Sequence, residues 1–489
     1  MPTLQRAGKT VSKANKLISV QLERFTERDF VWLLCTVFAI TVAVAAHVGV
    51  NGSHQWRQAD VLANVAGFRA PELIPPFTDF LGKKILYDIP VYQFCAAKLA
   101  KALSIDILPA IRYLNILLLA IFLPASYKLA ESITAGAGKY LILLLTFSPL
   151  FLRYWSAPLP DLMSLSLGAA WLSMALAKPS SLSLIIVSGV FLSISCVIKS
   201  PVIFPLAIFY GAFVYMSGGI IALRDRKVFI YAIIAFISAI GAEITRSIFL
   251  RDQIGFGQNP LWYFGALEIR FSREFWLYFL LHPRWELFLN RHVANFMLIV
   301  TFAGIVVGFW KSVKTFHLAV ACVAGALAGW LVFSNLYLIH DYYHLSSGYL
   351  LLLLAASMAS MIERFVFLQQ KVLFAAFISA LLIASAIKAP TIGRELTVTS
   401  EFDAMSFLLR NHRLVTFVSD VVSNHDPTMG GRLRTSLNPI PKEALEKDCQ
   451  LTTSHPVLIV GETSCHDLMA EKFDLVYRYP PYRLYLPRR

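Results

Sequence analysis

A cluster of polar and aromatic side chains begins directly after the first hydrophobic segment of the chain. The run His54-Gln55-Trp56-Arg57-Gln58-Ala59-Asp60 brings together an imidazole, an indole, a guanidinium and a carboxylate. A carboxylate can take a proton from a hydroxyl, a cation can stabilise a departing phosphate, and an aromatic face can hold a sugar ring. Trp and Arg also gather at headgroup level in ordinary membrane proteins. The run is therefore either an active site at a membrane surface or an interfacial belt, and alone it favours neither.

A second carboxylate, Asp161, follows Pro158-Leu159-Pro160 between two apolar segments. A carboxylate inside a membrane helix costs about 2.5 to 3.5 kcal/mol on insertion scales, so an acid at this boundary needs a reason. Asp after Pro at a helix start is good N-cap chemistry. Capping alone is one explanation of Asp161, and a place in a catalytic centre, with or without capping, is the explanation that we favour.

Two further polar groups lie on the same predicted side of the membrane. Lys199 lies in Ile198-Lys199-Ser200-Pro201, and His340-Asp341-Tyr342-Tyr343-His344 interrupts a long hydrophobic stretch. Lys199 either snorkels to the interface or binds the phosphate of a lipid carrier as a point charge. Two histidines at i and i+4 share a helix face, but one pair with a single Asp is weak evidence for a metal site. Contacts of this run to pyrophosphate or sugar hydroxyls are the stronger expectation, and a divalent metal stays an open question.

The elements that position these residues are apolar. Of the 489 residues, 57% are hydrophobic and 15% charged, and the mean hydropathy is +0.62, whereas a soluble globular protein is about 45 to 50% apolar. The sequence therefore predicts a polytopic α-helical membrane protein. Segments of about 17 to 25 apolar residues, long enough to span a bilayer, number about eleven. They lie near 30–50, 107–130, 139–155, 162–178, 181–198, 201–222, 228–246, 292–310, 316–339, 343–361 and 372–389.

Basic residues set the predicted orientation of these spans. Residues 1–28 carry six Lys or Arg residues and lack the cleavage pattern of a secretory signal, so they are assigned to the cytoplasm. Alternation from there places the other strongly basic short loops, such as 224–227, on the cytoplasmic side as well. The external side receives a loop over 51–106, a loop over 247–291 and a tail from 390 to the end.

The formal charge of +14 does not indicate nucleic-acid binding. Much of it lies in the predicted cytoplasmic loops, where the positive-inside bias and anionic lipid explain it. Cys449 and Cys465 both fall in the predicted external tail, where a disulfide is permissible and unpaired thiols are an equal alternative. No His and Cys spacing resembles a zinc site, and no Gly-rich phosphate loop is followed by Lys-Ser/Thr.

The predicted external segments have patterns of their own. Residues 57–68 indicate a short helix, and an amphipathic stretch from Val91 to Ala100 predicts a second helix lying flat on the membrane. The loop over 247–291 interleaves aromatic residues with basic ones, as in a belt or a substrate-contacting loop. From about 400 onward, short apolar runs such as 414–418 and 457–460 are separated by Pro, Asn and Gly, which predicts strands of a small α/β domain.

The order of these motifs carries a resemblance. The run from His54 to Asp60, then Asp88-Ile89-Pro90-Val91-Tyr92-Gln93, then Pro158 to Asp161, then Lys199-Ser200-Pro201, then His340 to His344 resembles the bacterial membrane glycosyltransferases related to protein O-mannosyltransferases and to the aminoarabinose transferase of lipid A. These belong to the GT-C superfamily, in or close to glycosyltransferase family 39. The likeness covers roughly residues 30 to 390, and the order of the five motifs is more specific than any one of them.

The resemblance implies a polyprenyl-phosphate-linked sugar donor, an active site on the external face, and inversion at the anomeric carbon. Asp60 and Asp161 match the acids of the first and second external loops, and Lys199 matches the cation that meets the donor phosphate. Relatives often carry Glu where this chain has Asp88, whose side chain is one methylene shorter. The remaining residues that we assign from these motifs are Arg57, His340, Tyr342, Tyr343 and His344 to the donor phosphate, and His54, Trp56, Asp88 and Tyr92 to substrate.

The sequence thus predicts a cytoplasmic segment (1–28), a transmembrane GT-C catalytic domain (29–390) and an external domain (391–489) in the inner, or plasma, membrane. The acceptor can be a lipid, a glycan or a protein. An O-antigen polymerase or ligase is the nearer alternative, but it would place its key Arg and His residues in a large late loop. A secondary transporter would place its charges near the midplane with an inverted repeat.

Overall fold

The computed structural model describes most of the helical part of the chain and the strands near its C-terminus. The described residues are 31–32, 35–36, 38, 58, 61, 65, 68, 89–155, 157–177, 181–249, 264–287, 291–311, 313–365, 414–419, 436–441, 457–460, 473–479 and 482–488. Among these residues, five helices are long and apolar enough to cross a membrane. They are α5 (Ile107–Ile133), α9 (Leu182–Gly218), α10 (Arg226–Phe249), α14 (Val313–Val332) and α16 (His344–Phe365). The chain is a multi-pass membrane protein.

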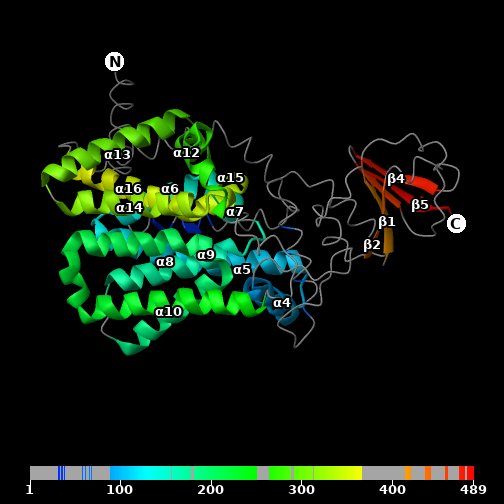
Figure 1. Cartoon of the computed structure of the whole chain (residues 1–489), viewed down its shortest axis with the longest axis horizontal. Coiled ribbons are helices and arrows are strands. Elements are labelled where there is room, and N and C mark those ends of the chain that lie inside the picture. Colours follow the sequence, from blue (N-terminus) through cyan, green and yellow to red (C-terminus); the bar gives the residue numbers. More distant parts are fainter. Residues whose placement is uncertain are drawn as a thin grey trace, which may run out of the picture.

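The other described helices complete the bundle. They are α4 (Val91–Leu103), α6 (Ala137–Phe147), α7 (Pro149–Trp155), α8 (Asp161–Ala177), α12 (Arg273–Glu286), α13 (Arg291–Lys311) and α15 (Ser334–Ile339), with the 3-10 turns η1 (Gly219–Arg224), η3 (Leu267–Phe271) and η4 (Asp341–Tyr343). In Figure 1 the long helices lie side by side, with α13 along one edge and α10 along the opposite edge. Helix α9 packs against α8, α10 and α14, and α16 packs against α6, α13 and α14.

The element α9 consists of two helices that meet at Lys199, whose backbone angles (φ −157°, ψ 85°) are not helical. Tyr231 of α10 interacts electrostatically with Tyr210 and also lies beside Ser188. A straight helix would separate residues 188 and 210 by about 33 Å at 1.5 Å per residue, too far for one side chain to reach both. The chain therefore doubles back at Lys199, as the separate spans predicted over 181–198 and 201–222 require.

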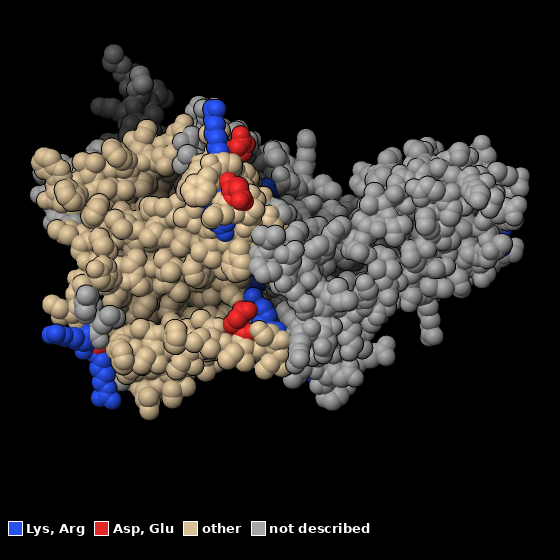
Figure 2. All heavy atoms as spheres, in the orientation of Figure 1, with Lys and Arg blue, Asp and Glu red and all other residues tan. Residues whose placement is uncertain are grey.

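The outer surface of the bundle suits a bilayer. Large apolar side chains such as Phe236, Ile248 and Phe302 are about two-thirds exposed, which is costly in water and favourable in lipid. Figure 2 shows charged side chains gathered toward the two ends of the helical part, with uncharged surface between them. This band is what the hydrocarbon core of a membrane covers.

Helices α9 and α14 approach closely through two glycines one turn apart. A Cβ on Gly325 would lie 2.6 Å from the carbonyl oxygen of Pro205, and a Cβ on Gly329 would lie 2.9 Å from Pro205 Cγ. Small residues at this spacing let membrane helices pack backbone to backbone. The approach fixes the end of α14, from which α15 and η4 continue.

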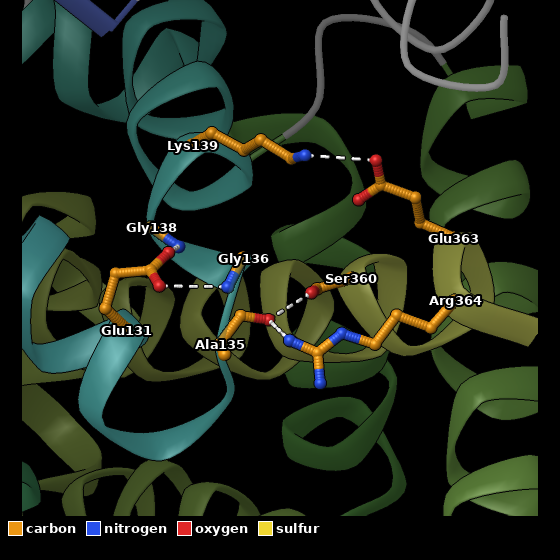
Figure 3. A network of polar contacts seen from close by, with 8 residues as sticks. All are labelled: Glu131, Ala135, Gly136, Gly138, Lys139, Ser360, Glu363 and Arg364. Atoms are coloured by element: carbon orange, nitrogen blue, oxygen red, sulfur yellow. Dashed lines mark hydrogen bonds and ion pairs between the residues drawn. The ribbon is translucent and has the colours of Figure 1, made fainter. Parts of the chain in front are cut away.

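A polar network ties α16 to the turn between α5 and α6, at the end of α16 far from His344 (Figure 3). Lys139 Nζ lies 3.0 Å from Glu363 Oε1, and both side chains are buried. Glu131 accepts hydrogen bonds from the backbone N–H groups of Gly136 and Gly138. The other two members, Ser360 and Arg364, both donate to the carbonyl of Ala135.

The strands near the C-terminus form one five-stranded sheet in the order β2-β1-β3-β5-β4 (Figure 1). The strands are β1 (Leu414–Ser419), β2 (Ser436–Pro441), β3 (Val457–Val460), β4 (Phe473–Tyr479) and β5 (Tyr482–Pro487). Strand β1 runs parallel to β2 and β3, while β5 runs antiparallel to β3 and β4. Strands β1 and β3 coincide with the two apolar runs that the sequence predicts as strands.

Candidate functional site

The structure describes part of the predicted site. Asp161, Lys199 and Tyr92, together with His340, Tyr342, Tyr343 and His344, lie among the described residues and are buried. The predicted site residues that lie outside the described residues are His54, Trp56, Arg57, Asp60 and Asp88.

Asp161 is the first residue of α8, so Pro160 occupies the capping position. The N–H groups of Met163 and Ser164 donate to the carbonyl of Pro160 at 3.1 and 3.2 Å. If Asp161 were the N-cap, its side chain would bind these two N–H groups. They already donate to the carbonyl of Pro160 instead. The carboxylate of Asp161 is fully buried and interacts electrostatically with both Tyr92 and Tyr337.

Asn115, on α5, fixes the turn that leads to Asp161. Its side-chain amide donates to the carbonyls of Trp155 (3.1 Å) and Ala157 (3.0 Å). The backbone carbonyl of Asn115 accepts a hydrogen bond from the indole N–H of Trp155. Tyr92 Oη donates to Asn115 Oδ1 at 2.8 Å. Burial raises the pKa of Tyr92 far above its usual value, although the bond to Asn115 opposes the shift. The phenol therefore stays protonated and serves as a hydrogen-bond donor.

Arg112 is a second buried residue of α5 that the sequence analysis does not single out. Its side chain is 1% exposed, and it interacts electrostatically with Tyr92, as Asp161 does. A guanidinium stays charged in a protein, so Arg112 places a permanent positive charge in the region of these two residues. The signal was present in the sequence, because Arg112 and Asn115 are polar residues inside an apolar span, where such residues are usually functional.

Lys199 is 4% exposed and stands where α9 doubles back. Its ammonium lies 5.2 Å from the ring centroid of Tyr343, within the range of a cation–π interaction. Pro201 follows in the first turn of the second helix of α9, where proline is favoured because its missing N–H would have no helical partner. The contact to Tyr343 joins the predicted phosphate-binding lysine to the 340–344 run.

The aromatic rings of the 340–344 run are stacked in series. His340 stacks on Tyr342, with centroids 5.1 Å apart and ring planes 15° apart, and Tyr342 lies 4.8 Å from Tyr343. Tyr154, on α7, meets the ring of Tyr342 edge-on at 6.1 Å. This series joins α7 to Tyr343, the ring that the Lys199 ammonium contacts.

His344 begins α16 and is packed among aromatic rings. Its Nε2 lies 3.0 Å from the carbonyl oxygen of Tyr337, and because a carbonyl only accepts, Nε2 carries a hydrogen. The rings of Tyr337, Phe279, Tyr278 and Trp330 lie within about 6 Å of the imidazole centroid. Two of these rings, Tyr278 and Phe279, come from α12, so the second predicted external loop reaches the site.

Arg270 holds that loop against the end of α14. Its guanidinium donates to Leu331 O (2.6 Å) and Val332 O, and also to the carbonyls of residues 264–266 in its own loop. The last carbonyls of a helix have no helical partner, and a cation there is favourable. The guanidinium of Arg270 thus binds backbone on both sides of the contact between η3 and α14.

No group of three or more His, Cys, Asp or Glu residues that could hold a metal ion occurs within the described ranges. The pair His340 and His344 differs in environment, because His340 stacks on Tyr342 while Nε2 of His344 donates to a backbone carbonyl.

Comparison with solved structures identifies the fold. No family model and no curated protein matches the chain by sequence. The structure is similar to that of ArnT from Cupriavidus metallidurans bound to undecaprenyl phosphate, with a TM-score of 0.60 and 11% identity over 93% of this chain and 97% of that chain. The chain has the GT-C fold. At the level of the fold, this confirms the resemblance seen in the sequence.

Two other solved structures are similar to this GT-C fold over part of their length. The apo oligosaccharyltransferase of Archaeoglobus fulgidus has a TM-score of 0.53 at 10% identity, over 86% of this chain and 65% of that chain. The arabinofuranosyltransferase AftD from Mycobacteria has a TM-score of 0.52 at 13% identity, over 94% of this chain and 40% of that one. Within the GT-C fold of this chain, Asp161, Lys199 and the 340–344 run form one contiguous region.

Proposed function

We propose that the protein is a membrane glycosyltransferase that transfers a sugar from a polyprenyl-phosphate donor to an acceptor hydroxyl on the external face of the plasma membrane, with inversion. One observation carries the proposal. Asp161 interacts electrostatically with Tyr337, the ring centroid of Tyr337 lies 5.9 Å from that of Tyr343, and the ammonium of Lys199 lies over the ring of Tyr343. An acid, sugar-sized aromatic surface and a buried cation are the groups that this reaction requires.

In the proposed reaction, the carboxylate of Asp60 takes the proton of the acceptor hydroxyl. The acceptor oxygen forms a bond to the anomeric carbon while the bond from that carbon to the phosphate oxygen breaks, and the phosphate leaves with the electron pair. One displacement of this kind inverts the anomeric centre. Lys199, Arg57 and the 340–344 run stabilise the charge on the phosphate, and a good leaving group removes the need for a nucleophilic residue.

The position of Asp161 supports a role beyond capping. The N–H groups that a capping side chain would bind already donate to Pro160 O, so helix capping does not explain why this carboxylate is buried here. We assign Asp161 to the catalytic centre, and His54, Trp56, Asp88 and Tyr92 to substrate.

The bilayer is part of the proposed mechanism. Each CH₂ of a polyprenyl chain buried in lipid contributes about 0.8 kcal/mol, which holds the donor in the membrane beside the site. The division into 1–28, 29–390 and 391–489 then separates a cytoplasmic segment, the catalytic domain and an external domain. The acceptor is a lipid, a glycan or a protein, and chelation of divalent metal during turnover tests whether an ion takes part.

Asparagine substitutions test the acids. We expect Asp60→Asn to lower turnover at saturating donor by at least about 10² to 10⁴-fold, the usual contribution of a general base, while thermal stability stays near that of wild type. Asp161→Asn should also lose most activity. Asp225 is the matched control, because its carboxylate caps α10 by accepting from Lys227 N at 2.9 Å, and Asn replaces Asp well at a cap.

Asp225→Asn should keep wild-type turnover and stability. Wild-type turnover by a well-folded Asp60→Asn protein would remove the general base from the proposal. Near-normal turnover by Asp161→Asn, matching Asp225→Asn, would return Asp161 to a helix-end role.

A further inference from the structure

The reversal of α9 at Lys199 leaves backbone carbonyls without helical donors. Proline supplies no N–H, so Pro201 leaves the carbonyl of Val197 without its helical donor, and Pro205 leaves the carbonyl of Pro201 without its own. Buried carbonyls without partners are costly, so a reversal inside a membrane protein needs donors from elsewhere.

Side-chain hydroxyls lie at this reversal. Ser200 Oγ lies 3.5 Å from Cys196 O, and Tyr337 Oη lies 3.4 Å from Pro201 O. These are long contacts. The shortest hydroxyl contacts to the backbone around the reversal come from a pair of serines, one on α8 and one on the first helix of α9.

Ser164 and Ser195 bond each other's backbones reciprocally. Ser195 Oγ donates to Ser164 O at 2.7 Å, and Ser164 Oγ lies 3.0 Å from Ser195 O and 3.3 Å from Lys199 O. A hydroxyl has one hydrogen, so Ser164 shares it among the carbonyl of Ser195, the Oγ of Ser195 at 3.0 Å and the carbonyl of Lys199. Both serines are fully buried, where hydrogen bonds are strong and their loss is costly.

Ser164 and Ser195 can reach each other's backbones because α8 and α9 pack closely. A Cβ on Gly168, one turn beyond Ser164, would lie 2.5 Å from Ile203 Cδ1 and 3.4 Å from Ser195 Oγ. Helix α8 therefore contacts both helices of α9 through small residues. Because Asp161 is one turn before Ser164 on α8, the same pair joins the helix of the acid to the backbone that carries the lysine.

We propose that Ser164 and Ser195 are positioning residues that hold the reversal of α9 in the one geometry that presents the Lys199 ammonium to the phosphate of the lipid-linked donor. The inference rests on the proposed function, since it needs Lys199 to meet a phosphate. Neither serine touches substrate. The two serines fix the position of the Lys199 backbone relative to Asp161. The position of that backbone in turn determines where the Lys199 ammonium lies.

The experiment isolates the phosphate contribution to binding. For each purified full-length variant, dissociation constants are measured for undecaprenyl phosphate and for undecaprenol, and the ratio of the second to the first reports the phosphate interaction alone. We expect Ser164→Ala and Ser195→Ala each to lower this ratio about tenfold, with undecaprenol affinity unchanged. Lys199→Ala should lower it at least as much.

Ser193→Ala is the matched control. Ser193 lies on the same helix of α9 and bonds the hydroxyl of Ser238 on α10 at 2.8 Å, so Ser193→Ala removes a part-buried hydroxyl bond of this helix away from the reversal. Its ratio should equal that of wild type. A purely structural role of Ser164 and Ser195 would change thermal stability in all three serine variants and leave every ratio unchanged.

The outcomes separate the two proposals. An unchanged ratio in both Ser164→Ala and Ser195→Ala, beside a lowered ratio in Lys199→Ala, overturns the positioning role and leaves the proposed function intact. An unchanged ratio in Lys199→Ala overturns the phosphate role of the lysine, and this inference falls with it. A lowered ratio in Ser193→Ala equal to that in Ser164→Ala also overturns the positioning role.

Discussion

The buried ion pair between Lys139 and Glu363 should stabilise the bundle only as a pair. Their charged atoms are 3.0 Å apart, and the side chains are 11% and 5% exposed. Removing one partner of a buried pair costs about 3 to 5 kcal/mol, because it strands the other charge. Since 1.4 kcal/mol is a factor of ten, Glu363→Gln or Lys139→Met should raise the unfolding equilibrium constant by about two to four orders of magnitude.

Replacing both residues should cost far less than either single change. Apolar side chains in place of a buried pair are often neutral in their effect on stability, so Lys139→Met with Glu363→Met should lie within about 1 kcal/mol of wild type. Unfolding by sodium dodecyl sulfate in mixed micelles, followed by circular dichroism, measures all the variants. Glu243→Gln is the control, because Glu243 is 67% exposed and lies 3.9 Å from Arg246, and such a pair contributes about 0 to 1 kcal/mol.

Two results would refute this reasoning. One is a double variant that loses as much stability as the two single changes added together. The other is a Glu363→Gln protein no less stable than Glu243→Gln. Under conditions where every variant is folded, the ratio of the dissociation constants for undecaprenol and undecaprenyl phosphate should equal that of wild type. The reason is distance, because Glu363 lies nineteen residues, about 28 Å, along α16 from His344.

Three other changes have expected outcomes. Lys199→Arg should keep part of the donor affinity that Lys199→Ala loses, because charge matters more than shape at a single phosphate contact; equal loss in both would show that ammonium geometry is required. Arg270→Lys should speed hydrogen exchange over 264–287 about tenfold, since lysine has three donors against the five of arginine. Unchanged exchange would show that the Arg270 hydrogen bonds do not hold this loop against the end of α14. Cysteine labelling should find residues 1–28 inside and 390–489 outside; labelling of residue 420 only after permeabilisation would overturn the odd number of spans.

The sequence predicts the helices well where hydrophobicity alone decides them. The spans expected near 107–130, 162–178 and 228–246 coincide with α5, α8 and α10. Two others are interrupted by short breaks. The span expected over 139–155 divides into α6 and α7 at Ser148, before Pro149, and that over 316–339 divides into α14 and α15 at Phe333. The spans expected near 30–50 and 372–389 lie largely outside the described residues.

The candidate site was assigned from residues near span ends, and the sequence did not point to the residues that support them. Asp161 and Lys199 are easily recognised, because a charged residue beside an apolar span is evident from the sequence alone. Ser164, Ser195 and Asn115 are not, because serine and asparagine occur in many membrane helices and their importance depends on which carbonyl of another helix they reach. That information exists only once α5, α8 and α9 are packed together.

The clamp made by Arg270 has a consequence for the conditions in which the protein works. In the proposed topology this loop faces the outside of the cell, where acidity follows the surroundings. A clamp built on histidine or a carboxylate would loosen or tighten as the medium changed. Arginine keeps its proton at every acidity that a cell survives, and its partners here are backbone carbonyls, which do not titrate. The contact of this loop with the end of α14 is therefore independent of the acidity outside the cell.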